Sequence, residues 1–193
     1  MSKNIVLCGV GGQGTILASK LISAAAMAQG LPVKSAETIG MAQRGGSVFS
    51  HIRMGEDAAC PMIVKGTADI ILGFEPGETV RMLPYLRQGG LVVVSKRAVM
   101  PVTAALAGSN YNGEEMVKYL RSVVDRLMVV DTDKACRELG SAKIVNLLLL
   151  GAAAASGELS LSVEDIRQAV IDRVPPKFHQ LNFSALDYAA NLK

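Results

Sequence analysis

The chain has few cysteines and few aromatic residues: three cysteines, 4% aromatic residues and no tryptophan in 193 residues. Cys8, Cys60 and Cys136 stand far apart, and the sequence contains no CxxC pair and no Cys/His cluster. An iron–sulfur cluster or a zinc site needs several thiolates at short spacing. We therefore expect this chain to hold neither of these metal groups itself.

Long runs of one charge and long hydrophobic runs are also missing. The net charge is +3, and no basic run of five or more residues occurs, so the footprint of a nucleic-acid-binding protein is not indicated. The longest apolar stretch, Ile144 to Ala155, contains Asn146 and Gly151 and is shorter than the ~20 residues of a membrane span. The N-terminus does not resemble a signal peptide, and the cysteine count is odd. We expect a cytoplasmic protein without nucleic-acid or membrane partners.

Hydrophobic residues make up 50% of the chain, and the charged residues make up 19%. This composition excludes a disordered chain, because such chains combine low hydrophobicity with high net charge. A chain of 193 residues buries roughly 70% of its unfolded surface, so it folds without disulfides or metals. The length predicts a single domain over residues 1–193.

Alternating strand and helix patterns run along the sequence. Strands are expected at 5–8, 32–36, 47–54, 68–74, 91–95 and 127–131, with a short pairing strand at 58–62. Helices are expected from about Ile16 to Gly30, after Pro76, at 114–121, from Thr132 as cap to Leu139, at 141–156, from Ser162 as cap to Val174, and at 180–192. This alternation predicts an α/β fold with a Rossmann-like, mostly parallel sheet flanked by helices and with a helical C-terminal part.

A glycine-rich loop, Gly9–Gly14, follows the first strand and matches G-x-G-x-x-G. Glycines let the backbone turn sharply and approach an anion, and the helix that follows offers free N–H groups. Glu37 stands near the position of the acid that grips a ribose in dinucleotide sites, so an NAD or FAD site is one interpretation. In the other interpretation, the glycines serve only a tight turn and close packing. The candidate binding residues are Gly9, Gly11, Gly12, Gln13 and Gly14.

A second candidate site lies in residues 41–47, where Gln43 and Arg44 precede Gly45 and Gly46. An arginine beside two glycines places a planar, charged guanidinium on a backbone that a ligand or another protein can approach closely. This favours contact with an anion, a carboxylate or a partner protein, and the alternative is a surface turn with a solvated arginine. No catalytic residue is assigned.

Three further residues stand out, and two of them, His51 and Glu75, carry two interpretations each. His51 lies in the middle of a strand and suits either acid–base chemistry or, more commonly, a structural role. Glu75 follows a strand end and either faces a site or only begins a helix. Cys8 is expected to be a small buried hydrophobic residue.

Residues 9–14 together with residues 37–48, which read Glu-Thr-Ile-Gly-Met-Ala-Gln-Arg-Gly-Gly-Ser-Val, resemble a known family. The sequence is similar to the gamma domain of 2-oxoacid:ferredoxin oxidoreductases, and within that family to the indolepyruvate branch. The likeness continues through Ser50–Arg53, Gly73–Pro76 and Val174–Asn182, and so covers nearly the whole chain. The glycine loop alone is unspecific, whereas its combination with Gly-Met-Ala-Gln-Arg-Gly-Gly is specific.

The resemblance implies a subunit that is inactive by itself. Enzymes of this family decarboxylate a 2-oxoacid oxidatively, form an acyl-CoA and reduce ferredoxin. Thiamine diphosphate, Mg2+ and 4Fe–4S clusters are implied for a large catalytic alpha subunit, with coenzyme A as co-substrate and an aryl pyruvate as the oxoacid. CoA binding is implied for the glycine loop and for Gln43, Arg44, Gly45 and Gly46. The alternatives are a Rossmann-type nucleotide-dependent oxidoreductase and a non-catalytic scaffold subunit.

Overall fold

A six-stranded sheet forms the centre of the molecule in a computed structural model, which describes residues 2–37, 46–56, 60–100 and 111–192. Across the sheet the order is β2 (Val33–Glu37), β3 (Ser47–Met54), β1 (Lys3–Val10), β4 (Ala68–Gly73), β5 (Leu86–Ser95) and β6 (Arg126–Val130). The strands β1, β4, β5 and β6 pair in parallel. β3 runs antiparallel to both β1 and β2, with Ile5 opposite Ile52. The α/β architecture with a mostly parallel sheet is therefore confirmed, with one reversed strand inserted beside β1.

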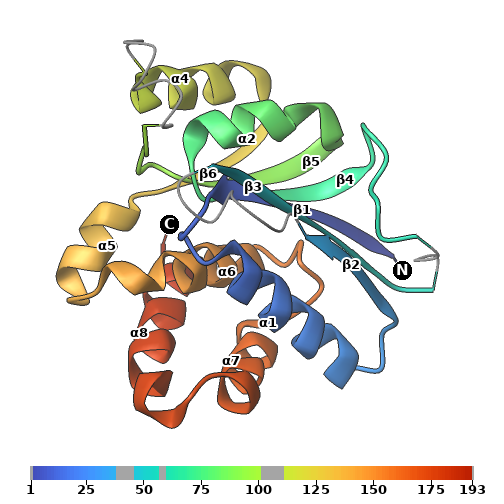
Figure 1. Ribbon diagram of the computed structural model, residues 1–193, viewed down its shortest axis with the longest axis vertical. Coiled ribbons are helices and arrows are strands. Elements are labelled where there is room, and N and C mark those ends of the chain that lie inside the picture. Colours follow the sequence, from blue (N-terminus) through green and yellow to red (C-terminus); the bar gives the residue numbers. More distant parts are fainter. Residues whose placement is uncertain (1, 38–45, 57–59, 101–110, 193) are drawn as a thin grey trace.

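Helices cover both faces of this sheet (Figure 1). One face carries α2 (Pro76–Met82) and α4 (Gly113–Val123), and the other carries α1 (Thr15–Ala28) and α6 (Val145–Ala155), on which α7 (Val163–Arg173) and α8 (His179–Ala190) pack. The short α5 (Thr132–Glu138) follows β6. Within the described residues, 3₁₀ turns lie at Leu83–Tyr85, Ala142–Ile144 and Pro176–Phe178. The helical C-terminal part predicted from the sequence consists of α6, α7 and α8, which lie on the same side of the sheet as α1.

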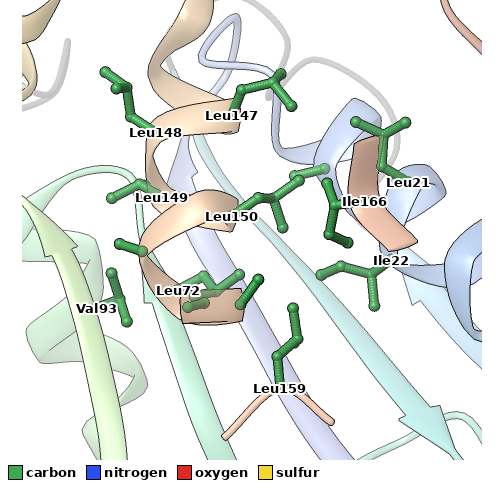
Figure 2. Packing of buried hydrophobic residues seen from close by; sticks show 14 of the residues in the cluster. Leu21, Ile22, Leu72, Val93, Leu147, Leu148, Leu149, Leu150, Leu159 and Ile166 are labelled. Atoms are coloured by element: carbon green, nitrogen blue, oxygen red, sulfur yellow. The ribbon is translucent and has the colours of Figure 1, made fainter. Parts of the chain in front are cut away.

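The helix α6, which is apolar except for Asn146, is the centre of the larger core. Its residues Val145 to Ala154 are all buried, and Leu147 to Leu150 have no exposed surface. Figure 2 shows these leucines between the strand residues Leu72 and Val93 and the helix residues Ile22 and Ile166. A helix that is apolar on every side is stable only when neighbours surround it. No helix in the described part of the chain is long and apolar enough to cross a membrane.

A smaller core lies between the sheet and the other helical face. It contains the side chains of β1, β4 and β5 that point toward α2 and α4, namely Val6, Cys8, Ile71, Val92 and Val94, together with Leu120 of α4. Adjacent strand residues point to opposite faces, so β1 contributes Ile5 and Leu7 to the larger core and Val6 and Cys8 to this one. The continuous apolar run of the first strand follows from burial on both faces.

Two local predictions are wrong. Residues 60–64 form no strand, and the remainder of the proposed strand at 58–62 lies outside the described residues. The cap of α5 is Asp131, whose carboxylate accepts the Lys134 N–H at 2.9 Å. Thr132 instead lies within the helix, and its hydroxyl bonds the Ser95 hydroxyl at 2.7 Å. The cap predicted at Ser162 is confirmed as a capping box with Asp165.

Candidate functional site

The glycine loop lies where β1 ends and α1 begins, at the carboxyl edge of the sheet. Gly12 and Gly14 have φ values of 97° and 87°, a backbone region that favours glycine. Gly14 is the N-cap of α1, and it gives the helix no side-chain cap. The first N–H groups of this helix are therefore available to an anion, which the helix dipole also favours.

Gln13 holds the loop in place. Its Oε1 accepts the Val10 N–H at 2.7 Å, and its Nε2 donates to the Phe74 carbonyl at 3.0 Å, so the side chain joins the ends of β1 and β4. A Cβ on Gly9 would lie 2.6 Å from Gln13 Oε1 and 2.7 Å from Phe74 Cβ. Gly9 is therefore a packing glycine, and the amide of Gln13 is used within the protein.

The two motifs singled out in the sequence meet at Gly46. The Gly11 N–H donates to the Gly46 carbonyl at 2.9 Å, so the glycine loop touches the end of the arginine–glycine segment. Gln43, Arg44 and Gly45 lie outside the described residues. Among the described residues, this backbone hydrogen bond joins the two motifs.

A cavity of about 340 Å³ lies above the glycine loop. Three segments from distant parts of the sequence form it, and its lining consists of Gly12, Gln13, Gly14, Leu17, Arg97, Val99, Ala142, Lys143, Val145 and Asn146. Arg97 and Lys143 are cations, and no carboxylate is among these residues. Two cations and free helix N–H groups around one cavity are suited to a phosphate or another anion.

Sequence reasoning missed three of these residues, namely Arg97, Lys143 and Asn146. Arg97 follows the carboxyl end of β5, a place where ligands of parallel sheets commonly bind, and this signal could have identified it. Lys143 and Asn146 come from the start of the buried apolar helix, where the sequence suggested only core packing. Asn146 lies against the loop, because a Cβ on Gly14 would be 3.1 Å from its Nδ2.

Two buried acids of α2 lie behind the glycine loop. Glu75 is the N-cap of this helix, where its Oε2 accepts the Glu78 N–H at 2.9 Å and its Oε1 accepts the Tyr111 hydroxyl. Glu78 Oε2 accepts the Ser47 hydroxyl at 2.5 Å. Burial raises the pKa of Glu75, and the hydrogen bond from Tyr111 opposes that shift. Glu75 is thus the helix-start acid of the sequence analysis, and it does not line the cavity.

Glu37 does not occupy the place of a ribose-binding acid. Its strand β2 is separated from β1 by β3, whereas the two are neighbours in a dinucleotide-binding fold. Its Oε1 accepts the hydroxyl of Ser19 on α1 at 2.8 Å. The geometry therefore argues against the NAD or FAD interpretation.

His51 and Cys8 are both buried outside the cavity. His51 Nδ1 accepts the Ile63 N–H at 3.1 Å, and burial lowers the pKa of the imidazole. Burial also raises the pKa of the Cys8 thiol well above its ordinary value, so the thiol is unreactive. Both residues have structural roles. In the described part of the chain, no group of three or more His, Cys, Asp or Glu residues could hold a metal ion.

Comparison with known proteins agrees with this geometry. The family described as pyruvate ferredoxin/flavodoxin oxidoreductase matches residues 4–192. Indolepyruvate oxidoreductase subunit IorB of Pyrococcus horikoshii is 36% identical over 95% of this chain and 92% of that protein. The same subunit of Thermococcus kodakarensis is 38% identical over the same shares.

A solved structure confirms the fold. The gamma subunit of keto/oxoacid ferredoxin oxidoreductase from Geobacter sulfurreducens superposes with a TM-score of 0.69 at 24% identity, covering 97% of this chain and 96% of that one. The resemblance inferred from the two motifs is therefore confirmed, and the curated relatives are subunits of oxidoreductases. On its matched residues and its relatives, the chain belongs to the pyruvate ferredoxin/flavodoxin oxidoreductase family.

Proposed function

We propose that this chain is the subunit without iron–sulfur clusters of an indolepyruvate-type 2-oxoacid:ferredoxin oxidoreductase. Its relatives at 36% and 38% identity are subunits of indolepyruvate oxidoreductases, and the lengths match nearly from end to end. The complex converts an aryl pyruvate and CoA to an acyl-CoA and carbon dioxide, and two electrons pass to ferredoxin. A large alpha subunit in the cytoplasm supplies thiamine diphosphate, Mg2+ and 4Fe–4S clusters. This division agrees with the three dispersed cysteines of this chain.

The role of this chain within the complex is to hold CoA. The observation that carries this proposal is the cavity lined by Arg97, Lys143 and the glycine loop. Arg97 and Lys143 would bind phosphate oxygens by charge, and the N–H groups at the start of α1 would donate to them. Arg44, whose guanidinium is a planar donor, is proposed as a further residue that binds CoA. CoA itself supplies the thiol that receives the acyl group.

Removing the two cations of the cavity tests CoA binding. We expect Arg97→Ala and Lys143→Ala each to raise the dissociation constant of CoA in the assembled complex roughly tenfold, because each variant loses a charge-assisted contact. Isothermal titration measures this constant, and steady-state kinetics should show a matching rise in the KM for CoA with kcat within about twofold. Lys134→Ala is the matched control, since Lys134 is an exposed cation of α5 that does not line the cavity.

A ligand without phosphate separates phosphate recognition from other contacts. Pantetheine should bind much more weakly than CoA to the unchanged complex and should be insensitive to Arg97→Ala. Equal binding of CoA by Arg97→Ala, Lys143→Ala, Lys134→Ala and the unchanged protein would refute a phosphate site in this cavity.

A panel of 2-oxoacids tests the substrate of the complex. We expect indolepyruvate to give the highest kcat/KM.

A further inference from the structure

The walls of the cavity are held from behind by one turn of α2 that does not itself line the cavity. The first wall is the glycine loop, and the second consists of Arg97 and Val99. The glycine loop connects to the carboxylate of Glu78, and the wall with Arg97 and Val99 connects to the carboxylate of Glu75. Glu75 has no exposed surface and Glu78 is 3% exposed, so both carboxylates are buried, whereas Ser47 is an exposed residue at the start of β3.

The first wall is reached through Ser47 and Gly46. Glu78 Oε2 accepts the Ser47 hydroxyl at 2.5 Å, which fixes the start of β3 against α2. The preceding residue, Gly46, accepts the Gly11 N–H at its carbonyl at 2.9 Å. A movement of Ser47 therefore moves the acceptor that holds the glycine loop.

The second wall is reached through a backbone contact. The Val99 N–H donates to the carboxylate of Glu75, and Val99 and Arg97 both line the cavity. The Tyr111 hydroxyl and the Glu78 N–H donate to the same carboxylate. Glu75 thus joins the strand end that carries Arg97 to the helix that also holds Ser47.

We propose that Glu75 and Glu78 are positioning residues, which set the distance between the glycine loop and Arg97 without touching the bound anion. The inference rests on the proposed function, because CoA is the anion whose affinity reports this distance. A charged ligand that spans two walls loses affinity when the walls separate by a fraction of an ångström, since charge-assisted hydrogen bonds need short contacts.

Variants of Ser47 and Glu78 test the first wall in the assembled complex. Ser47→Ala removes the donor to Glu78 and should raise the dissociation constant of CoA roughly three- to tenfold, the effect of one hydrogen bond. The KM for CoA should rise with it, and kcat should stay within about twofold. Ser47→Thr keeps the hydroxyl and Glu78→Gln keeps an acceptor oxygen, so both should bind CoA within about twofold of the unchanged protein.

Ser50→Ala is the matched control for the loss of a buried hydroxyl. Ser50 is buried in the same strand, but it points to the opposite face of the sheet, toward the larger core. We expect this variant to lower the melting temperature without changing the dissociation constant of CoA. If Ser50→Ala weakens CoA as much as Ser47→Ala does, the effect is general destabilisation and the positioning role is overturned.

The second wall is tested at Glu75. Glu75→Gln keeps one acceptor oxygen and should weaken CoA less than Glu75→Ala, which removes the partner of Val99. Equal affinities in Ser47→Ala, Glu75→Ala and the unchanged protein would overturn the proposal for both walls. An unchanged complex that binds no CoA would overturn the proposed function instead, so the two failures are distinguishable.

Discussion

Two glycines of the loop resist a side chain for different reasons: Gly9 is packed against neighbouring atoms, whereas Gly12 has a positive φ. Substitution by alanine should therefore lower the free energy of unfolding by different amounts. Gly9→Ala should destabilise the chain by about 1–3 kcal/mol, because the new Cβ would overpack against Gln13 and Phe74. Gly12→Ala should cost only about 1 kcal/mol, since its φ is positive but its Cβ meets no atom within 4 Å. Denaturant unfolding of both variants measures the difference. A larger cost for Gly12→Ala would show that backbone conformation outweighs packing in this loop.

The buried imidazole of His51 gives a second prediction, on the pH dependence of stability. Burial lowers the pKa of His51 in the folded protein, so the unfolded chain binds a proton at a higher pH than the folded one does. Stability should therefore be unaffected above the unfolded pKa of about 6.5 and should fall below it, by at most about 1.4 kcal/mol per pH unit. Protonation would also remove the acceptor for the Ile63 N–H.

Denaturation midpoints between pH 7 and pH 5 measure this slope. His51→Gln removes the titrating group and should flatten the pH dependence. His179→Gln serves as the comparison, because His179 is the second histidine of the chain, on α8, and the prediction requires His51→Gln to change the slope more than this variant does. Identical slopes in all three proteins would assign the pH dependence to other groups.

At the scale of elements, α6 and α8 pack so closely at Gly151 that there is no room for a side chain at this position. A Cβ on Gly151 of α6 would lie 2.9 Å from the Ala189 Cβ and 3.0 Å from the Leu186 carbonyl oxygen on α8. In an exposed helix, a change of glycine to alanine gains about 1 kcal/mol of helix propensity. Here we expect Gly151→Ala to be destabilising, because overpacking costs about 1–3 kcal/mol. Thermal unfolding measures the sign, and a raised melting temperature would mean that α8 shifts freely.

The positions of most strands and helices along the chain could be predicted from the sequence. Which strands pair with each other in the sheet could not. Hydrophobic spacing located β1, β3 and β4, and Ser162 and Gly30 marked helix ends, because these signals are local. The place of β3 between β1 and β2 depends on pairing across the sheet, which leaves no local signal. The choice of Asp131 over Thr132 as the cap of α5 also depended on a distant group, the Ser95 hydroxyl.

The same distinction applies to the candidate site. The glycine loop could be predicted because one short segment contains it. Arg97, Lys143 and Asn146 come to the loop from β5 and α6, so their proximity follows only from the fold. The internal role of Gln13 was likewise invisible, since its partner Phe74 is 61 residues away.

At the scale of the whole molecule, the proposed function predicts an inactive isolated chain. The purified chain should show no visible absorption of an iron–sulfur protein and no oxidoreductase activity, since its cysteines are dispersed. Activity should appear when the alpha subunit is added, and analytical ultracentrifugation should show the two chains together. Stoichiometric iron and acid-labile sulfide in the isolated chain would contradict this division of roles.

The reversed strand β3 imposes an order on assembly. Because β2 pairs with β3 alone among the described strands, the first β–α–β unit cannot close on itself as it does in a fold whose first two strands are adjacent. A nascent chain that ends before Ser47 therefore lacks the strand with which β2 pairs, and we expect β2 to join the sheet only after β3 has formed. The amide hydrogens of β2 should exchange with solvent no more slowly than those of β3, because opening of β3 also removes the pairing of β2.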